Sequence, residues 1–571
     1  MALTCTQPHP LAHAAGLFVQ EDPAQTLGTA VLPSAQSTSH SMHWVPQGSV
    51  RVNPLPSASH GSPGSSGQAV SARTESTSSK RRMPEQYPLP SAPSPKESPV
   101  STDPSLTDRA QAAADLLEEI VADRGLLAGL EPDLMKRLLI AAGRASHPTK
   151  GEVRSLRKAK RKREKEARRR ADEALLDRTS IRKARAQAVF ATPSNDAPRE
   201  LAPPEEPIEL NAPRSCYVCK TKFTTLHAFY DSMCGPCGDL NYAKRTQTAD
   251  LSGRTALLTG GRVKIGYHAG IKLLRAGCRL IVTTRFPHDA AKRYAAEEDA
   301  AQWADRLVIH GLDLRNSPAV EAFCQHLLQT EERLDFIISN ACQTVRRPPG
   351  FYAHLMDAER QPALLTPEAQ ALIGHVGVEP STDLAPLQGA ASAELSQVPL
   401  LPEDHDASLT LFPAGQLDAD LQQVDLRAVN SWRLLAHEVP TIELLEVQLV
   451  NAVAPFILNA RLKELMLRTP ERDKHIVNVS AVEGQFYRTF KTARHPHTNM
   501  AKAALNMMTR TAAPDYVRDG IHMNSVDTGW VTDEDPEHHA TRKRDEHRFH
   551  PPLDIVDGAA RIVAPIFEGF T

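Results

Sequence analysis

The sequence lacks several features that would place a chain of 571 residues in a membrane or outside the cell. No apolar run approaches the roughly 20 residues that a membrane-spanning helix needs. The first residues do not combine a basic start with a following apolar segment, so a secretory signal is not expected. No arginine precedes Arg51, which argues against an organellar transit peptide. We therefore expect a cytoplasmic protein that does not contact a membrane.

The chain also lacks an excess of charge of either sign. Lysine and arginine number 66 against 68 acidic residues, and the sequence pI is about 6.9. The overall charge therefore predicts no particular partner. A disulfide scaffold is not expected either, because eight cysteines are few for this length and four of them are clustered.

Residues 1–104 contain little that could form a core. Serine, proline, alanine, threonine, glycine and histidine dominate this segment. Such a composition buries too little apolar surface to offset the entropy lost on ordering, which predicts a disordered region. An alternative is a Ser/Pro-rich leader, which would make the protein a secreted effector.

From residue 105 to 190 the pattern becomes helical. Apolar residues at helical spacing predict one helix from Asp108 and a second, short helix from Pro132. Residues 151–187 contain no proline and many lysines and arginines, which predicts one long basic helix. A solvated helix is the plainest interpretation, and nucleic-acid binding or nuclear targeting are the alternatives. The absence of aromatic residues from this run argues against stacking on single-stranded bases.

A linker and a small metal site are predicted next. Residues 191–214 are rich in proline and glutamate and favour a linker. Two C-x-x-C pairs follow within residues 215–250, and their cysteines are Cys216, Cys219, Cys234 and Cys237. Each pair can present two thiolates from one tight turn, so the two pairs complete a tetrahedral zinc site. Four thiolates leave no position for a catalytic water, so the zinc is expected to be structural, and His227 an ordinary polar residue.

Residues 251–571 alternate apolar strand-like runs with helical patterns. This order is typical of an α/β fold with a Rossmann-type, doubly wound parallel sheet. The strand-like runs begin at residues 255, 279, 306, 334, 475 and 522. A long insertion, about residues 350–440, interrupts the pattern, and we expect it to be a lid, a partner surface or a disordered loop.

The stretch LLTGGRVKIGYHAG, residues 257–270, is typical of a phosphate-binding turn between a strand and a helix. Gly260 allows a tight turn, and Gly266 allows close packing of the helix. Backbone N–H groups at the start of that helix can face a pyrophosphate. Lys264 stands where such loops usually have another glycine, and its side chain can either contact phosphate or block the cofactor.

These motifs resemble those of the short-chain dehydrogenase/reductase family, over roughly residues 253–571 without the insertion. The family's loop T-G-x-x-x-G-x-G corresponds to Thr259–Gly266. NAD-preferring members tend to carry an acid where this chain has Thr284 and Arg285, so the resemblance implies NADP, with NAD as the alternative. By the same resemblance the cofactor-binding residues are Thr259, Gly260, Lys264, Gly266, Thr284, Arg285, Asp313, Asn340 and Lys502.

The catalytic part of the resemblance is incomplete. Asn451, Ser480 and Lys502 correspond to the family's helix asparagine, substrate-orienting serine and lysine. The family's tyrosine corresponds to Thr498, whose hydroxyl is too weak an acid to protonate a carbonyl. The nearby residues that could replace it are Tyr487, His495 and His497.

The resemblance therefore implies an NADP(H)-dependent oxidoreductase with a displaced proton donor, acting on a small-molecule carbonyl or alcohol. A catalytically inactive nucleotide-binding regulatory or scaffold protein is the alternative, and Thr498 favours it. A third hypothesis is a nucleic-acid-associated protein that binds through the basic helix and the zinc module. The family resemblance also implies that copies of the chain associate into a homo-oligomer.

Overall fold

The computed structural model describes residues 105–185, 191–194, 201, 206–374, 392–405, 410–413, 415–418, 422–487 and 491–570. The segment 1–104, for which disorder is predicted, lies outside these residues. The described chain divides into two compact units, one ending at Ser155 and the other beginning at Leu156.

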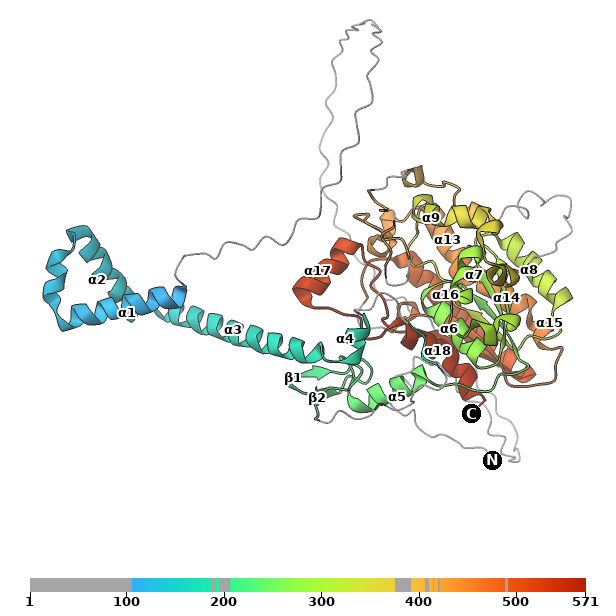
Figure 1. Ribbon diagram of the computed structural model, residues 1–571, viewed down its shortest axis with the longest axis horizontal. Coiled ribbons are helices and arrows are strands. Elements are labelled where there is room, and N and C mark those ends of the chain that lie inside the picture. The colour runs from blue at the N-terminus through green and yellow to red at the C-terminus, as the bar shows by residue number, and fades with distance from the viewer. Residues whose placement is uncertain are drawn as a thin grey trace, which may run out of the picture. The chain divides into compact units, whose positions relative to one another are not determined.

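The smaller unit is helical. Helix α1, Leu106–Ala122, begins at a capping box in which Ser105 and Asp108 exchange hydrogen bonds. A 3₁₀ turn, η2 at Arg124–Gly129, leads to helix α2, Pro132–Ser146, which has its proline in the first turn. The two short helices predicted from the apolar spacing are therefore confirmed (Figure 1).

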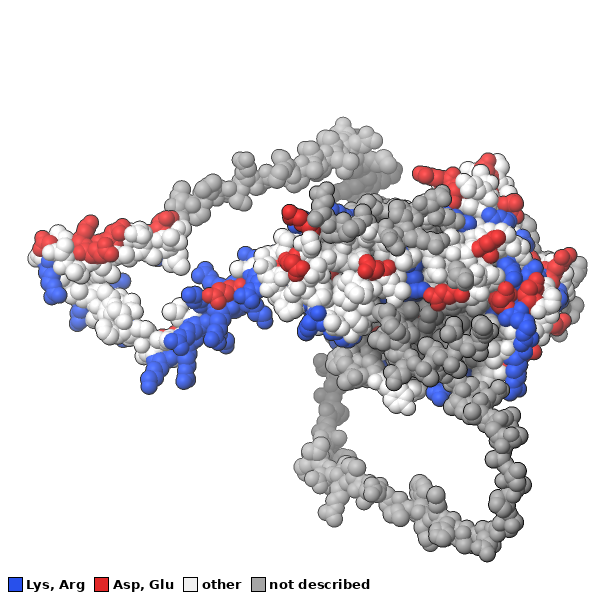
Figure 2. All heavy atoms as spheres, turned by 90° about the horizontal axis from the view of Figure 1, so that it is seen from below, with Lys and Arg blue, Asp and Glu red and all other residues white. Residues whose placement is uncertain are grey.

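The basic helix α3, Lys150–Leu176, crosses from one unit to the other, and Leu176 is its only buried residue. Figure 2 shows lysine and arginine side chains gathered along it. The predicted helix is confirmed, but it ends at Leu176 rather than at residue 187, and a separate helix α4 follows at Ser180–Arg185. The break has a tertiary cause, because the backbone N–H groups of Ser180 and Ile181 donate to the carbonyls of Ala228 and Phe229.

The four-cysteine segment forms a small antiparallel pair and a helix. Strand β1, Glu209–Ser215, pairs with β2, Lys222–Thr225, and helix α5 follows at Gly235–Arg245. Strand β1 begins inside the stretch expected to be a linker, so the ordered module is longer than the cysteine spacing indicates. Its segment Glu209–Arg245 belongs to the same unit as the rest of the chain to the C-terminus.

A six-stranded parallel sheet follows, as predicted, in the order β5-β4-β3-β6-β7-β8. Its strands are β3 Thr255–Thr259, β4 Arg279–Thr284, β5 Leu307–Gly311, β6 Phe336–Ser339, β7 Lys474–Ser480 and β8 Ile521–Asp527. The chain order reverses between β3 and β6, so a crevice opens at the carboxyl ends of these two strands. Ligands of open α/β sheets bind at this position.

Helices cover both faces of the sheet. Helices α6, Lys264–Arg275, α7, Pro287–Ala295, and α18, Ile555–Glu568, share one apolar core with the sheet. Helices α8, Ser317–Thr330, α14, Ala454–Arg461, and α16, Pro496–Tyr516, build the core on the other face. The side chains of Leu258 and Leu257 go to different faces, as expected for neighbours in a strand.

One covering helix is continuous through α13, Thr441–Gln448, a π-turn η9, Leu449–Val453, and α14. Within the described residues it is the one helix with the length and apolar composition of a membrane span. It contacts α8 and α16, so in this structure it is part of the domain core.

The insertion contains α9 Pro349–Arg360, α10 Pro367–Ala371 and α12 Ser392–Leu395. The C-terminal part also has α15 Lys463–Met466 and α17 Glu537–His547. Short 3₁₀ turns complete the described structure: η3 Ala300–Gln302, η4 Ala304–Arg306, η5 Pro362–Leu364, η6 Pro402–His405, η7 Ser431–Arg433, η8 Ala436–Glu438, η10 Val482–Gly484 and η11 Val517–Asp519.

Candidate functional site

A cavity of about 1130 Å³ lies at the carboxyl ends of the strands. It contains most of the site residues predicted from the sequence. Those that line it are Gly260, Lys264, Gly266, Thr284, Arg285, Asp313, Asn340, Ser480, Thr498 and Lys502. Thr259 and Asn451 lie behind the lining.

The glycine loop is shaped to admit a ligand close to its backbone. Gly260 has φ +69°, and a Cβ added at Gly266 would lie 2.2 Å from the Gly260 carbonyl oxygen. The Asn340 amide donates to the carbonyls of Thr259 and Gly260, at 3.1 and 3.0 Å, and holds the turn. Residues with side chains could not adopt this arrangement, so the loop fits the pyrophosphate of a dinucleotide.

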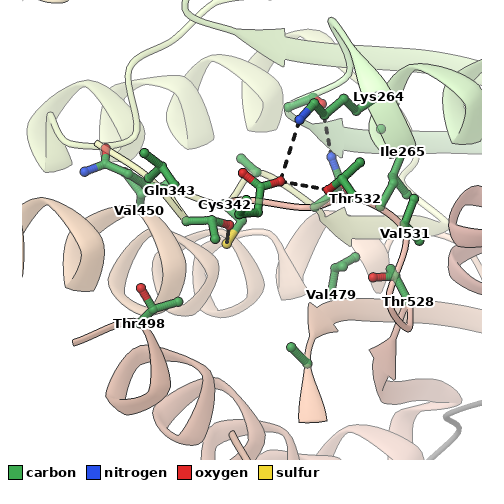
Figure 3. A pocket seen from close by; sticks show the side chains of 18 of the residues that line it. Lys264, Ile265, Cys342, Gln343, Val450, Val479, Thr498, Thr528, Val531 and Thr532 are labelled. Atoms are coloured by element: carbon green, nitrogen blue, oxygen red, sulfur yellow. Dashed lines mark hydrogen bonds and ion pairs between the residues drawn. The ribbon is translucent and has the colours of Figure 1, made fainter. Parts of the chain in front are cut away.

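Lys264 keeps the backbone conformation of the glycine that it replaces. Its φ of +54° lies in the left-handed region, which costs a residue with a side chain roughly 1–2 kcal/mol. Its ammonium lies 3.6 Å from the Glu534 carboxylate in the segment after β8 (Figure 3). The charge of Lys264 is the main reason why the pKa of Glu534 lies below its usual value.

Two substitutions can separate the backbone strain at Lys264 from its charge. Both Lys264→Gly and Lys264→Ala remove the ammonium, but only glycine relieves the positive φ. We expect the glycine variant to be more stable than the alanine variant by about 1 kcal/mol, measured by urea denaturation. Equal stabilities of the two variants would contradict the left-handed conformation.

The side of the cavity next to β4 carries an arginine held by the insertion. The Arg285 guanidinium donates to the Tyr352 hydroxyl at 2.6 Å and lies 4.7 Å from the centre of that ring. Burial alone would raise the pKa of Tyr352, but Arg285 and Arg347 outweigh it and the pKa is lowered. Within the described part of the chain Arg285 has no carboxylate partner, whereas Arg347 pairs with Asp425. Its charge is therefore available to an anionic ligand.

A buried ionic network extends from Asp313 into the insertion. Asp313 accepts from the backbone N–H and the guanidinium of Arg315, the latter at 2.6 Å. Arg315 also pairs with Glu446, which in turn pairs with Arg346 at 3.0 Å. Arg346 then binds both oxygens of Asp404 in the insertion. Burial alone would raise the pKa of Asp313, but the hydrogen bonds and the charge of Arg315 outweigh this effect. The pKa therefore lies below its usual value, and the carboxylate stays ionised.

Three residues predicted to serve the chemistry lie at the β7 and α16 side of the cavity. The Lys502 ammonium donates to the Val479 carbonyl at 2.7 Å. The hydroxyls of Ser480 and Thr498 are buried and make no hydrogen bond to any residue that the structure describes. Buried hydroxyls normally have a partner, so these two groups are suited to bind a polar ligand.

Thr259 and Asn451 support the lining from behind. The Thr259 hydroxyl accepts from the Ala341 backbone N–H at 3.0 Å. Asn451, in the π-turn η9, accepts from the backbone N–H of Gln343 and donates to its carbonyl. Both side chains therefore fix the segment that follows β6. Single π-turns in α-helices are frequent at functional sites.

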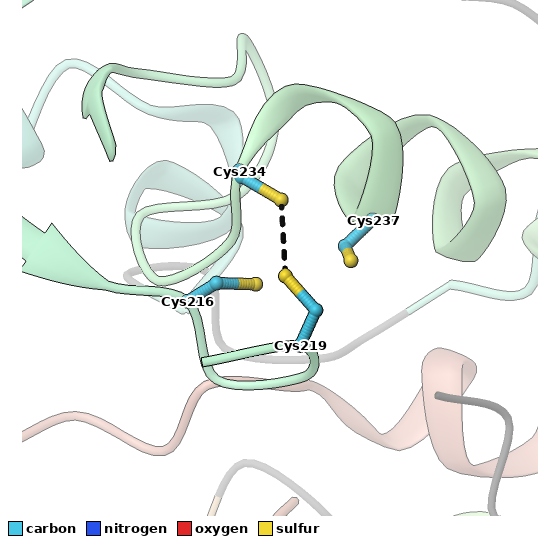
Figure 4. Close-up of side chains that lie close together, drawn as sticks. All are labelled: Cys216, Cys219, Cys234 and Cys237. Carbon is cyan, nitrogen blue, oxygen red and sulfur yellow. Dashed lines mark hydrogen bonds between the residues drawn. The ribbon is translucent and has the colours of Figure 1, made fainter. Parts of the chain in front are cut away.

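The four cysteines form one cluster (Figure 4). Their sulfur atoms all lie within 4.8 Å of one another, and those of Cys219 and Cys234 are 3.6 Å apart. Sulfurs of a tetrahedral zinc site are about 3.8 Å apart, since the zinc–sulfur bond is about 2.3 Å. The cluster therefore has the donor set and the spacing of a metal site. His227 is not a member, because its Nδ1 accepts from the backbone N–H groups of Phe229 and Tyr230.

The cysteine module packs on the sheet domain and reaches the cavity. Arg245 of α5 pairs with Asp554 and Asp557 at 2.7 and 2.8 Å, and all three are buried. Tyr217 lies between Cys216 and Cys219 in the sequence. Its hydroxyl accepts a hydrogen bond from the backbone N–H of Trp530, in the loop after β8. The module thus supplies part of the cavity wall.

Comparison with known proteins finds similarity over parts of the chain. A family profile described as "Enoyl-(Acyl carrier protein) reductase" matches residues 431–550. An uncharacterized protein of Acanthamoeba polyphaga mimivirus, R665, is 31% identical over 371 residues, which are 62% of this chain and 71% of the viral protein. Human retinol dehydrogenase 14 is 34% identical over 117 residues, which are 18% of this chain and 35% of the human protein. These matches show that parts of the chain are similar to short-chain dehydrogenases/reductases.

A solved short-chain dehydrogenase from Burkholderia cenocepacia, in complex with NADP, is 16% identical with a TM-score of 0.35. It covers 56% of this chain, and 91% of its own length is matched. The predicted Rossmann-type fold is confirmed by the parallel sheet of this chain and by its strand order. Its four-cysteine cluster is confirmed as a set of neighbouring thiols.

Sequence reasoning did not find several residues that shape the site. Tyr352, Asp404 and Trp432 belong to the insertion, which has no pattern that predicts where a loop folds back. Arg346 and Glu446 are buried charged residues whose partners are distant in the sequence. For Glu446 the one signal in the sequence was a charge within an apolar run, and this signal does not identify the partner.

Proposed function

We propose that the protein is an NADP(H)-dependent oxidoreductase that interconverts a carbonyl and an alcohol. One observation carries the proposal: a single cavity brings the glycine loop, Arg285 and the group Ser480, Thr498 and Lys502 together. A phosphate cradle, an available cation and unpartnered hydroxyls in one cavity are what a dinucleotide and a small polar substrate need.

The residues fit two parts of the cofactor. The start of α6, where Lys264 and Gly266 line the cavity, suits the pyrophosphate. Thr284 and Arg285 would hold the 2′-phosphate. Bound there, NADPH would supply a hydride to a carbonyl carbon.

The protein's own groups would orient the substrate. The Ser480 and Thr498 hydroxyls can donate to a carbonyl oxygen, since neither has a partner among the described residues. Lys502, fixed by the Val479 carbonyl, places a positive charge near the oxygen that becomes negative during reduction. The proposed loss of the family's tyrosine at position 498 leaves the proton donor to another residue.

Cofactor preference tests the proposal. Arg285→Ala removes the cation assigned to the 2′-phosphate, and a charge-assisted hydrogen bond is worth about 1.5–3 kcal/mol. We expect NADPH to bind about 10- to 100-fold more weakly, with NADH affinity unchanged, in fluorescence titrations. Arg360→Ala is the control, because Arg360 is an exposed arginine of the insertion that pairs with Glu394 and does not line the cavity. If wild-type protein binds both cofactors equally, the assignment of Arg285 is wrong.

We propose that the cysteine cluster holds a structural zinc ion. Four sulfur ligands fill a tetrahedral shell, so no open position is left for substrate or water. The zinc would then take no part in the reaction, and the cavity would be the one place where chemistry occurs. That copies of this chain associate into a homo-oligomer stays a prediction.

The alternative is a nucleotide-binding regulatory protein, which Thr498 favours because threonine cannot act as the acid. NADPH binding without turnover on a broad panel of aldehydes and ketones would support this alternative. Turnover of any carbonyl with NADPH would exclude it.

A further inference from the structure

We propose that His495 is the proton donor and acceptor of this cavity, an assignment that rests on the oxidoreductase function proposed above. His495 lies three residues before Thr498, at the N-terminal end of α16, and lines the same cavity as Ser480 and Lys502. An imidazole is the side chain best suited to exchange a proton near neutral pH.

The structure separates His495 from the other two donors considered from the sequence. The Tyr487 side chain is 100% exposed and does not line the cavity. His497 is buried behind the lining, where its Nε2 lies 3.2 Å from the Glu443 carboxylate of α13. His495 is therefore the one of the three that faces the site.

The imidazole of His495 is held in a defined orientation. It stacks on the Trp432 indole, with ring centres 3.8 Å apart and planes inclined by 6°. Its backbone N–H donates to the Leu434 carbonyl at 2.8 Å. Its φ of +43° lies in the left-handed region, and such strain in a residue other than glycine tends to mark functional sites. The insertion therefore positions the ring through Trp432 and Leu434.

Three polar atoms in this part of the structure lack a hydrogen-bond partner among the described residues: the Nδ1 of His495 and the hydroxyls of Ser480 and Thr498. All three atoms are buried, and their residues line one cavity. A substrate oxygen would accept from those that turn toward it. Burial lowers the pKa of His495, and Glu483 and Asn499 oppose this effect, so the imidazolium gives up its proton readily.

The proposed step is balanced in atoms and electrons. In the reducing direction, the carbonyl carbon receives a hydride, with its two electrons, from the C4 position of NADPH, which leaves NADP⁺. The carbonyl oxygen takes a proton from the His495 imidazolium, which becomes neutral imidazole and regains a proton from solvent. The product is the alcohol, and the reverse reaction uses His495 as the base.

The variant His495→Gln keeps a polar side chain but cannot donate a proton to an alkoxide. We expect kcat to fall by about 10²- to 10⁴-fold with unchanged NADPH affinity. Added imidazole should restore part of the rate, which a merely structural role would not allow. His437→Gln is the matched control, since His437 is an exposed histidine close in sequence to Trp432 and Leu434, the residues that contact His495. Full activity of His495→Gln, in a protein whose wild type turns over, overturns the proposal and leaves the oxidoreductase function intact.

A second measurement does not depend on turnover. Diethyl pyrocarbonate should modify His495, read by mass spectrometry of peptides, and bound NADPH should slow that modification. His437 should react at the same rate with and without NADPH. His495 that does not react, or that reacts equally with NADPH bound, overturns the proposal. Absence of turnover by wild-type protein that binds NADPH overturns both the proposal and the oxidoreductase function.

Discussion

Replacing Cys216 or Cys234 by serine is expected to abolish metal binding and to destabilise the protein by several kcal/mol. Structural zinc sites bind with apparent free energies of about 10–16 kcal/mol, and much of that free energy stabilises the fold. Cys216 is buried among the residues that join the module to the sheet domain. The expected result is loss of about one zinc per chain by elemental analysis and a lower midpoint of thermal unfolding.

Cys342→Ser serves as the control for this experiment. Cys342 is an exposed cysteine that lies outside the cluster, so its replacement should change neither the metal content nor the midpoint. Wild-type protein that is purified under reducing conditions and contains no metal would refute the zinc assignment. A serine variant as stable as wild type would refute the structural role.

The second large effect is expected at the glycine loop. A Cβ at Gly266 would lie 2.2 Å from the Gly260 carbonyl oxygen and 2.3 Å from the Asn340 amide nitrogen, so the loop must shift. Overpacking of this kind costs about 1–3 kcal/mol. We expect Gly266→Ala to weaken NADPH binding by about 10- to 100-fold in fluorescence titrations.

Gly143→Ala is the matched glycine control. A Cβ there would meet no atom within 4 Å, and Gly143 lies in α2, outside the sheet domain. NADPH affinity should therefore stay at the wild-type value. Unchanged affinity in Gly266→Ala would show that NADPH does not use this loop.

The sheet could be predicted from the sequence because each of its strands is marked by a short apolar run of neighbouring residues. Strands β3, β6 and β7 are buried on both faces, and their apolar runs end at or next to polar residues. Of these polar residues, Asn340 and Ser480 line the cavity, and Thr259 lies behind its lining. The break between α3 and α4 was missed, since it depends on hydrogen bonds to Ala228 and Phe229, which are distant in sequence.

The structure of the insertion could not be predicted from the sequence. Its composition left a lid, a partner surface and disorder open, and its described part lines the cavity through Tyr352 and Trp432. The choice among three candidate donors also needed tertiary structure, because it depends on which of the three residues faces the cavity. His497 and His495 are separated by one residue, yet only His495 meets the cavity.

The salt bridges between Arg245 and the two aspartates of α18 make the module and the sheet domain one cooperative unit. A chain cut at residue 250 would leave the Asp554 and Asp557 carboxylates buried without their cation, which costs about 3–5 kcal/mol. It would also uncover Leu553 and Val531, which pack against the module. The boundary at residue 250 is therefore a boundary of sequence motifs and not of folding. The smallest part of the chain that we expect to fold as the sheet domain therefore includes the four-cysteine module.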